Sequence, residues 1–202
     1  MLRKLTPVQT VLLVLLAVFT VFITWRAKKI ERALASHDAA SEMRGKQAPE
    51  FLLASLDGRK VSMSEFRGKK KVVVSYWASW CGPCRVELPE LKRFYEKYHK
   101  EDSDFEILAV SIDDDRESAE SFAVKAKLPF PVLLDLSHTV ADAYSVEAIP
   151  TMFIVQKDGH VSYANTGLNE SLEIQLGSQL GINMENIFRS PKVEEKSDDA
   201  SD

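Results

Sequence analysis

Hydrophobic positions in this chain form one long N-terminal block, followed by short runs that polar turns separate. No charged residue occurs from Leu5 to Trp25, and Val11 to Phe19 is unbroken apolar sequence. A helix that spans a bilayer needs about 20 predominantly apolar residues, so this block predicts one transmembrane helix. Trp25 stands at its end, where an interfacial aromatic side chain is expected.

A cleavable signal peptide is the alternative interpretation of this block. Its apolar region would be shorter, and a cleavage site of small residues would follow it. The sequence that follows here is Trp25-Arg26-Ala27-Lys28-Lys29, which favours a retained anchor. We therefore expect a cytoplasmic stub and transmembrane anchor over residues 1–27, and a polar stalk that continues the helix over residues 28–44.

The charges that flank the anchor bear on its orientation. Arg3 and Lys4 precede it, and a larger basic group follows it, made of Arg26, Lys28, Lys29 and Arg32. Taken alone, the positive-inside rule would place the domain after the anchor in the cytoplasm.

After the stalk, apolar and β-branched runs alternate with segments in which apolar residues recur every three or four positions. The runs predict strands near 48–53, 60–62, 71–77, 105–112, 131–136, 151–156 and 160–165. The spaced segments predict helices near 84–100, 117–127, 138–144 and 170–180. Turns at Asp57-Gly58 and Lys157-Asp158-Gly159 make hairpins of the strands that flank them. This order indicates a three-layer α/β domain over residues 45–185.

Composition and charge exclude some classes of function. The hydrophobic share of 45% is normal for a chain with a packed core, and the formal net charge is −4. Without a basic surplus, the chain has no electrostatic footprint for nucleic acid, so we expect no such partner. Residues 186–202 are acidic and nearly free of large apolar side chains, which predicts a disordered tail.

The chain has two cysteines, Cys81 and Cys84, three positions apart. A disulfide between them would close a loop too small to constrain the unfolded chain much. A structural zinc site needs about four ligands, and the sequence has neither a second CxxC nor paired histidines. Asp113 to Asp115 lack the spacing of a calcium loop, and we expect them to form a solvated loop that caps the next helix. The sequence therefore predicts no metal site.

The cysteine pair stands where a buried strand meets a helix, a context typical of redox motifs. Cys81 would lie at or just before the helix N-terminus, where unpaired N–H groups favour a thiolate. Cys84, one turn along, can reach Cys81 and resolve a mixed disulfide. Pro83 suits the first turn of a helix, and Gly82 lets a substrate backbone approach closely. These residues predict thiol–disulfide exchange with Cys81 as the attacking group.

The stretch from Tyr76 to Cys84, YWASWCGPC, resembles the active-site segment of thioredoxin. Further segments are similar to the TlpA/ResA-like branch and occur in that family's order: Ala48–Phe51, Asp57-Gly58, Phe66–Lys69, Arg85–Leu91, Pro131–Asp135 and Tyr144–Thr151. The resemblance runs from about Gly45 to Leu180.

This resemblance implies a thioredoxin-like fold, with a central mixed sheet flanked by helices and an N-terminal β-hairpin extension. It implies a cis peptide bond at Pro150, packed beside the cysteine pair, whereas an X-Pro bond taken alone is expected to be trans. The backbone at Ile149 would then hold a substrate peptide in a strand-like form. Trp80 is expected to line the site.

The resemblance also implies an activity and a place in the cell. Such proteins reduce disulfides of exported proteins, such as apocytochromes, in the periplasm, which conflicts with the orientation that the flanking charges favour. Electrons would come from a membrane thiol donor, and the Cys81–Cys84 disulfide would be the redox group, with no other cofactor. The oligomeric state is not indicated.

The chain departs from thioredoxin on the strand before the motif, where Ser75 stands in place of a buried acid. A proton donor to the leaving thiolate must then come from elsewhere, from water or from another side chain. Glu87, three residues after Cys84, is one candidate because it lies on a neighbouring face of the helix. A surface ion pair is the alternative role for Glu87.

Two other functions compete with disulfide exchange. Peroxiredoxins share much of this architecture, but they place a threonine three residues before the reactive cysteine, where this chain has Ala78. A non-catalytic tethered metallochaperone could use both thiols for a soft metal, but the His or Met cluster expected for copper is missing from the sequence.

Overall fold

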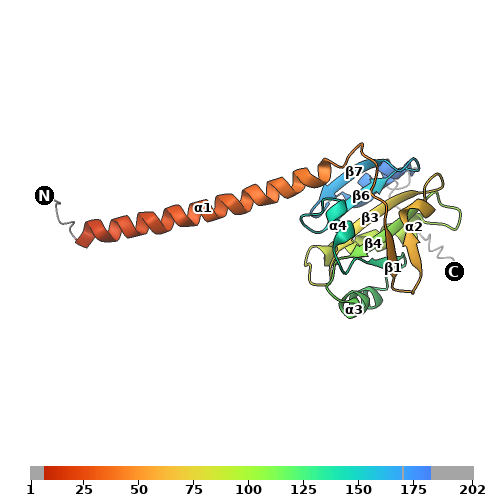
Figure 1. Ribbon diagram of the computed structural model, residues 1–202, viewed down its shortest axis with the longest axis horizontal. Helices are drawn as coiled ribbons and strands as arrows, with labels where there is room; N and C mark the ends of the chain where they lie inside the picture. Colours follow the sequence, from red (N-terminus) through yellow and green to blue (C-terminus); the bar gives the residue numbers. More distant parts are fainter. Residues whose placement is uncertain (1–6, 170, 183–202) are drawn as a thin grey trace, which may run out of the picture.

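The computed structural model describes residues 7–169 and 171–182, without the side chains of residues 7, 8, 10–12 and 30–38. A seven-stranded sheet forms the centre of one domain, from which a long helix projects (Figure 1). The predicted acidic tail, residues 186–202, lies outside the described residues, as do Arg3 and Lys4.

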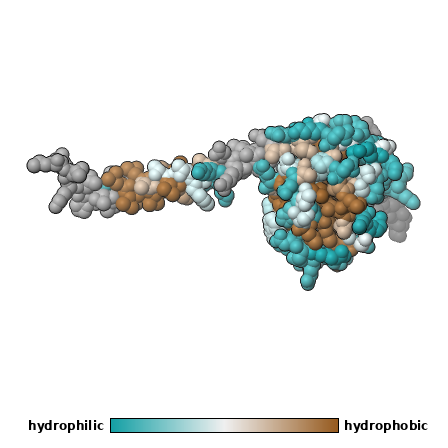
Figure 2. All heavy atoms as spheres, in the orientation of Figure 1, coloured by the Kyte–Doolittle hydropathy of each residue, from teal (hydrophilic) through white to brown (hydrophobic). Residues whose placement is uncertain are grey.

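The long helix, α1, runs from Pro7 to Ser41 and so contains most of the predicted anchor and stalk. Large apolar side chains are exposed along it between Leu13 and Trp25, and Figure 2 shows them as an apolar stretch on the projecting helix. Within the described part of the chain, no helix has the length and sustained apolarity that a bilayer crossing requires.

The sheet is mixed, as the resemblance implies. Its strands are β1 (Leu52–Ser55), β2 (Lys60–Ser62), β3 (Lys71–Trp77), β4 (Phe105–Ser111), β5 (Val132–Leu134), β6 (Thr151–Val155) and β7 (Val161–Thr166), in the spatial order β2-β1-β5-β4-β3-β6-β7. β3, β4 and β5 are parallel to one another, whereas β6, β7 and the β1–β2 hairpin pair antiparallel with their neighbours. The hairpin is the predicted N-terminal extension.

Helices cover both faces of the sheet. They are α2 (Cys84–Tyr98), α3 (Arg116–Ala126), α4 (Thr139–Ala143) and α5 (Leu172–Leu180), and a 3-10 turn spans Met63–Glu65. Buried residues of α2, α3 and α5 pack with one face of the sheet, and those of α4 and the last turn of α1 with the other. β3 supplies both cores in strict alternation, for example with Val73 on the α2 side and Val74 on the α4 side, because successive side chains of a strand point to opposite faces.

The topology brings several chain segments to one edge of the sheet. The carboxyl ends of the parallel strands β3 and β4 lie together, since Trp77 pairs with Ser111. The start of the antiparallel strand β6 lies at the same edge, since Thr151 pairs with Tyr76 near the end of β3 and with Thr166 at the end of β7. The loops after β3 and β4 and the loop before β6 therefore meet at this edge.

Candidate active site

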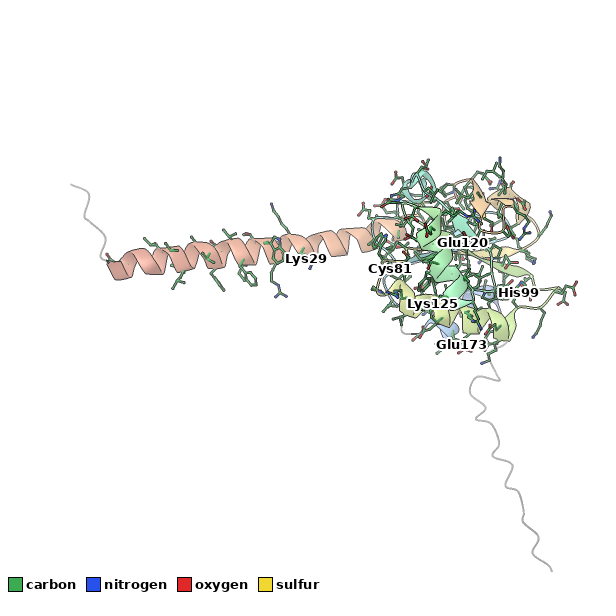
Figure 3. All side chains as sticks on the ribbon, turned by 90° about the horizontal axis from the view of Figure 1, so that it is seen from below. Lys29, Cys81, His99, Glu120, Lys125 and Glu173 are labelled. Carbon is green, nitrogen blue, oxygen red and sulfur yellow. A yellow bond between two sulfur atoms is a disulfide. The ribbon has the colours of Figure 1, made fainter. Side chains whose placement is uncertain are left out.

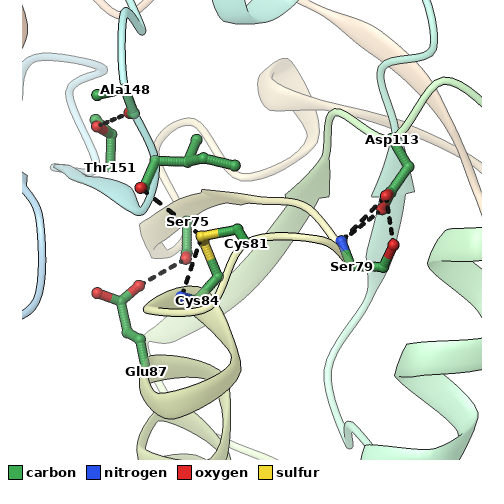
Figure 4. Close-up of a disulfide and its surroundings, with 9 residues drawn as sticks. Ser75, Ser79, Cys81, Cys84, Glu87, Asp113, Ala148 and Thr151 are labelled. Carbon is green, nitrogen blue, oxygen red and sulfur yellow. Dashed lines mark hydrogen bonds between the residues drawn. A yellow bond between two sulfur atoms is a disulfide. The ribbon is translucent and has the colours of Figure 1, made fainter.

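Cys81 and Cys84 lie at this edge and form a disulfide, with their Cα atoms 5.3 Å apart (Figures 3 and 4). The chain turns sharply after β3, and the Cys81 amide donates a hydrogen bond to the Ala78 carbonyl at 3.1 Å. Pro83 is the N-cap of α2, with the helical φ of −60° that its ring favours. Cys84 is fully buried as the first residue of α2, whereas Cys81 keeps 5% of its surface exposed. Cys81 is therefore the sulfur that a substrate reaches first.

The helix N-terminus acts directly on Cys81. The backbone N–H of Cys84 donates to the Cys81 Sγ at 3.1 Å. This amide is one of those that have no carbonyl partner within the helix, and it lies at the positive end of the helix dipole. In the reduced protein, the same donor would stabilise a thiolate at Cys81 and so lower the thiol pKa.

The segment before β6 faces the disulfide. The Ile149–Pro150 peptide bond is cis, as the resemblance implies, and the Ile149 carbonyl oxygen lies 3.7 Å from the Cys81 Sγ. The loop is held from two sides, because the Thr151 hydroxyl donates to the Ala148 carbonyl at 2.6 Å and the Gly167 amide donates to the Pro150 carbonyl at 2.8 Å. The backbone that would align a substrate is thus fixed beside the attacking sulfur.

The other sequence-predicted site residues leave the surface next to Cys81 open. Trp80 is 66% exposed, and Gly82 and Pro83 are exposed as well. A Cβ atom added at Gly82 would meet no atom within 4 Å, so the fold itself tolerates a side chain there, and glycine keeps that space free for an incoming backbone.

Glu87 is buried beneath this surface, with 2% of its area exposed, so the alternative of a surface ion pair is wrong. Its Oε1 accepts a hydrogen bond from the hydroxyl of Ser75 at 3.1 Å, and Figure 4 shows the two side chains pointing toward each other. Its Oε2 has no hydrogen-bond partner in the described structure. Burial raises the pKa of Glu87 to about 7, against a smaller lowering by the Ser75 hydroxyl. Glu87 can therefore exchange a proton near neutral pH.

Asp113 departs from the expected solvated loop. Asp115 does cap α3, since its side chain accepts from the Ser118 amide, but Asp113 is 1% exposed. Its carboxylate accepts from the amide and the hydroxyl of Ser79, two residues before Cys81, as Figure 4 shows. Ser79 and Asp113 each lie two residues after the end of a parallel strand, and these two strands are neighbours in the sheet. Their matching positions after successive strands are the signal by which the sequence could have placed them together.

Within the part of the chain that the structure describes, no group of three or more His, Cys, Asp or Glu side chains could hold a metal ion. The groups that the fold brings to this edge are a disulfide, the buried carboxyl groups of Glu87 and Asp113, and the exposed ring of Trp80. Such a set can exchange disulfides through Cys81 and Cys84.

A mixed sheet with a CxxC disulfide between β3 and α2, and a cis-proline loop against it, defines the thioredoxin-like thiol–disulfide oxidoreductases. The comparisons agree. The model of the AhpC/TSA family matches residues 44–164. The ResA thiol–disulfide oxidoreductase of Geobacillus kaustophilus is 33% identical over 175 residues, 86% of this chain and 93% of the relative. That of Bacillus subtilis is also 33% identical, covering 68% of this chain and 75% of the relative.

Solved structures of similar proteins support the same assignment to the thioredoxin-like thiol–disulfide oxidoreductases. A protein from Chlorobium tepidum assigned as a thiol:disulfide interchange protein DsbE has a TM-score of 0.62 at 32% identity, covering 68% of this chain and 98% of its own. A thiol–disulfide oxidoreductase from Bacteroides fragilis has a TM-score of 0.59 at 32% identity, covering 66% of this chain and 99% of its own. This chain belongs to the AhpC/TSA family and, within the thioredoxin fold, to the ResA-like thiol–disulfide oxidoreductases.

Proposed function

We propose that this chain reduces disulfides of exported proteins, such as apocytochromes, while attached to the outer side of the cell membrane. The observation that carries the proposal is the Cys81 sulfur, which lies between the N-terminal amide of α2 and the Ile149 carbonyl. The first contact favours a thiolate, and the second places the sulfur where an extended substrate backbone would lie. Gly82 and Pro83 between the cysteines resemble the reducing members of the CxxC proteins.

In the reaction, the thiolate of reduced Cys81 attacks one sulfur of the target disulfide, and the other target sulfur leaves as a thiolate that takes up a proton. The Cys84 thiol then loses its proton and attacks the Cys81 sulfur. The mixed disulfide breaks, the target leaves with two thiols, and the enzyme keeps the Cys81–Cys84 disulfide. Two electrons pass from the enzyme to the target, and a membrane thiol donor restores the reduced pair.

Glu87 is the proton acceptor that we propose for Cys84. Cys84 is fully buried, so water has little access to its thiol. Glu87 follows it by three residues on the same helix, and positions at this spacing are neighbours on the helix surface. A carboxyl group with a pKa of about 7 can take the proton in one half of the cycle and return it in the other.

Membrane attachment is supported by the charge-free stretch from Leu5 to Trp25 and by the exposed apolar side chains of α1. Burying that surface in lipid would remove it from water. Two measurements test it: retention of the full chain in the membrane pellet after alkaline carbonate washing, and a topology reporter fused after Lys100. Release into the supernatant would reject attachment, and a cytoplasmic reporter signal would reject the outer location.

The reducing direction is tested by equilibrating the Cys81–Cys84 pair with glutathione or thioredoxin redox couples. We expect a potential toward the thioredoxin end of the range, about −270 mV, and a value near about −120 mV would reject the direction. A Cys84→Ala variant should hold its targets as mixed disulfides at Cys81, because the resolving thiol is missing. A Cys81→Ala variant is the matched control and should hold none.

The peroxidase alternative is disfavoured by the site itself. The residue three positions before Cys81 is Ala78, which is fully buried and has no hydroxyl with which to polarise a peroxide. Turnover of peroxide with an added thiol reductant would decide the matter.

A further inference from the structure

Asp113 is a buried carboxylate that the exchange reaction described above does not use. Its two oxygens lie 3.0 Å from the backbone nitrogen of Ser79, and the Ser79 hydroxyl donates to Oδ1 at 2.7 Å. On the other side, the Ser111 hydroxyl donates to Oδ2 at 2.8 Å, and the Asp113 amide donates back to the Ser111 hydroxyl oxygen at 3.0 Å. Among the described residues, no lysine or arginine forms an ion pair with it.

A buried carboxylate with no cation beside it is costly unless hydrogen bonds satisfy its oxygens. Here three donors do so, and two of them come from Ser79. Hydrogen bonds to an ionised acceptor are about twice as strong as neutral ones. The arrangement therefore ties the loop after β3 to the end of β4, where Ser111 is fully buried.

The tied loop leads directly into the nucleophile. Ser79 is the second residue of the turn that the Cys81 amide closes onto the Ala78 carbonyl. Ala78 and Cys81 anchor the two ends of the turn in the core, whereas Trp80 is largely exposed, so the hydrogen bonds of Ser79 to Asp113 are what hold the middle of the turn. Cys81 ends this turn, and its Sγ accepts a hydrogen bond from the backbone N–H of Cys84 at 3.1 Å. The conformation of the turn therefore decides whether this contact forms.

We propose that Asp113 is a positioning residue, which holds the Ser79–Trp80 loop and thereby keeps the Cys81 sulfur on the N-terminal amide of α2. This role of Asp113 concerns only disulfide exchange at the Cys81–Cys84 pair. It does not depend on the direction of electron flow, the substrate or the membrane attachment proposed above.

The test is the pH dependence of alkylation of the reduced full chain by iodoacetamide, followed at Cys81 by mass spectrometry of the modified peptide. Asp113→Asn keeps the shape of the side chain but leaves one acceptor oxygen for three donors. The Ser79–Trp80 loop would then be held less firmly, and the Cys81 sulfur would lose part of its contact with the Cys84 amide. The pKa of Cys81 should therefore rise by about 0.5 to 1 unit. Loss of a nearby negative charge without any change of position would instead lower it.

Two further variants separate position from charge. Ser79→Ala leaves the carboxylate charge in place and removes the 2.7 Å hydrogen bond, so it should raise the pKa of Cys81 in the same direction by a smaller amount. Asp114→Asn is the matched control, since it removes one negative charge from the next position, where the side chain is 94% exposed, and it should cause no rise.

A fall or no change in Asp113→Asn overturns the proposal, and so does an unchanged Ser79→Ala. A rise in Asp114→Asn equal to that in Asp113→Asn would also overturn it. If Asp113→Asn fails to fold, judged by circular dichroism, the milder Ser79→Ala variant decides alone. Because the readout needs no protein substrate, its failure is distinct from failure of the proposed reductase function.

Discussion

At the scale of single residues, Glu87 links the chemistry of the site to pH. Its carboxyl group is buried against Ser75, and burial raises its pKa to about 7. Replacing it with glutamine keeps the size and the hydrogen bond but removes the transferable proton.

If Glu87 serves Cys84, Glu87→Gln should slow resolution of the mixed disulfide by about 100-fold, the low end of general acid–base effects. The inflection near pH 7 in the wild-type rate should also disappear. Stopped-flow Trp fluorescence during reduction of a protein disulfide would measure both. Glu96→Gln is the matched control on the same helix, because that side chain is exposed and does not act on Glu87, and it should retain the wild-type profile. An unchanged profile in Glu87→Gln would remove Glu87 from the mechanism.

Glu87 should also make the stability of the protein depend on pH. Its pKa is about 7 in the folded chain and near its ordinary value of 4.5 in the unfolded chain, so the folded state holds the proton more tightly. The stabilisation is fully present below about pH 4.5 and is lost as pH rises through about 7, a change of about 3 kcal/mol. Urea unfolding of wild type and Glu87→Gln at pH 4.5 and 8 would measure it. Relative to wild type, the free energy of unfolding of the variant should be higher at pH 8 than at pH 4.5. The same difference between the two proteins at both pH values would contradict this.

The sequence identified some of these residues and missed others for a physical reason. Cys81 and Cys84 are recognisable because their spacing and their position before a helix define the chemistry locally. The burial of Glu87 and Asp113 depends on contacts with Ser75 and Ser79, which lie 12 and 34 positions away. A carboxylate in a buried network has the same local sequence signature as one in water.

At the scale of elements, the sequence predicted the individual strands and helices well, because each of them has a strong local pattern. The predicted strand 71–77 is β3, and its β-branched run reflects burial on both faces. The predicted helix 84–100 is α2, which ends at Tyr98, two residues early. The strand order was not predictable from such patterns, because it depends on pairings such as β3 with β6, 75 or more residues apart.

Helix α2 gives a test of how packing supports the site. Leu88 is fully buried between α2 and the sheet, next to Glu87, and Leu88→Ala should reduce the free energy of unfolding by about 2 to 5 kcal/mol. Val86→Ala is the control on the exposed side of the same helix, and a change within about 0.5 kcal/mol is expected. Denaturant unfolding measures both, and equal losses would show that α2 does not pack as described.

At the scale of the whole molecule, the joint between α1 and the domain decides how the site is presented. Ala40 and Met43 are buried in the core on the α4 side, and backbone bonds run from Gly45 to Val161 and from Val161 to Lys46. The Arg44 guanidinium donates to the Ala164 carbonyl at 2.7 Å and lies over the ring of Tyr163. The end of the stalk is therefore attached along β7, the edge strand.

The Ala164 contact of this attachment lies toward the active-site edge, whereas the backbone bonds of Val161 lie at the other end of β7. Ala164 is two residues before Thr166, which pairs with Thr151 beside Pro150, and Figure 3 shows Cys81 on the side of the domain from which α1 projects. The 17 residues from Trp25 to Ser41 are helical and span about 24 Å from the first to the last. With the proposed membrane attachment, α1 would hold the active site at a fixed distance from the membrane, on the side of the domain that faces the membrane. A membrane thiol donor could reach the site there. The polar composition of residues 28–44 predicted the stalk but not this joint, because Arg44 contacts residues about 120 positions away.

Arg44→Ala should loosen the joint without unfolding the domain. The variant loses the bond to Ala164 and the contact with Tyr163, so the amides of Gly45 and Val161 should exchange with deuterium up to about tenfold faster. Amides in β3 and β4 should keep their protection, because they belong to the centre of the sheet. Arg59→Ala is the control, since that arginine pairs with Asp57 on the exposed hairpin and should leave both amides unchanged. If Arg44→Ala also left them unchanged, the backbone bonds and the packing of Ala40 and Met43 would hold α1, and the side chain of Arg44 would have no part in fixing the domain on its stalk.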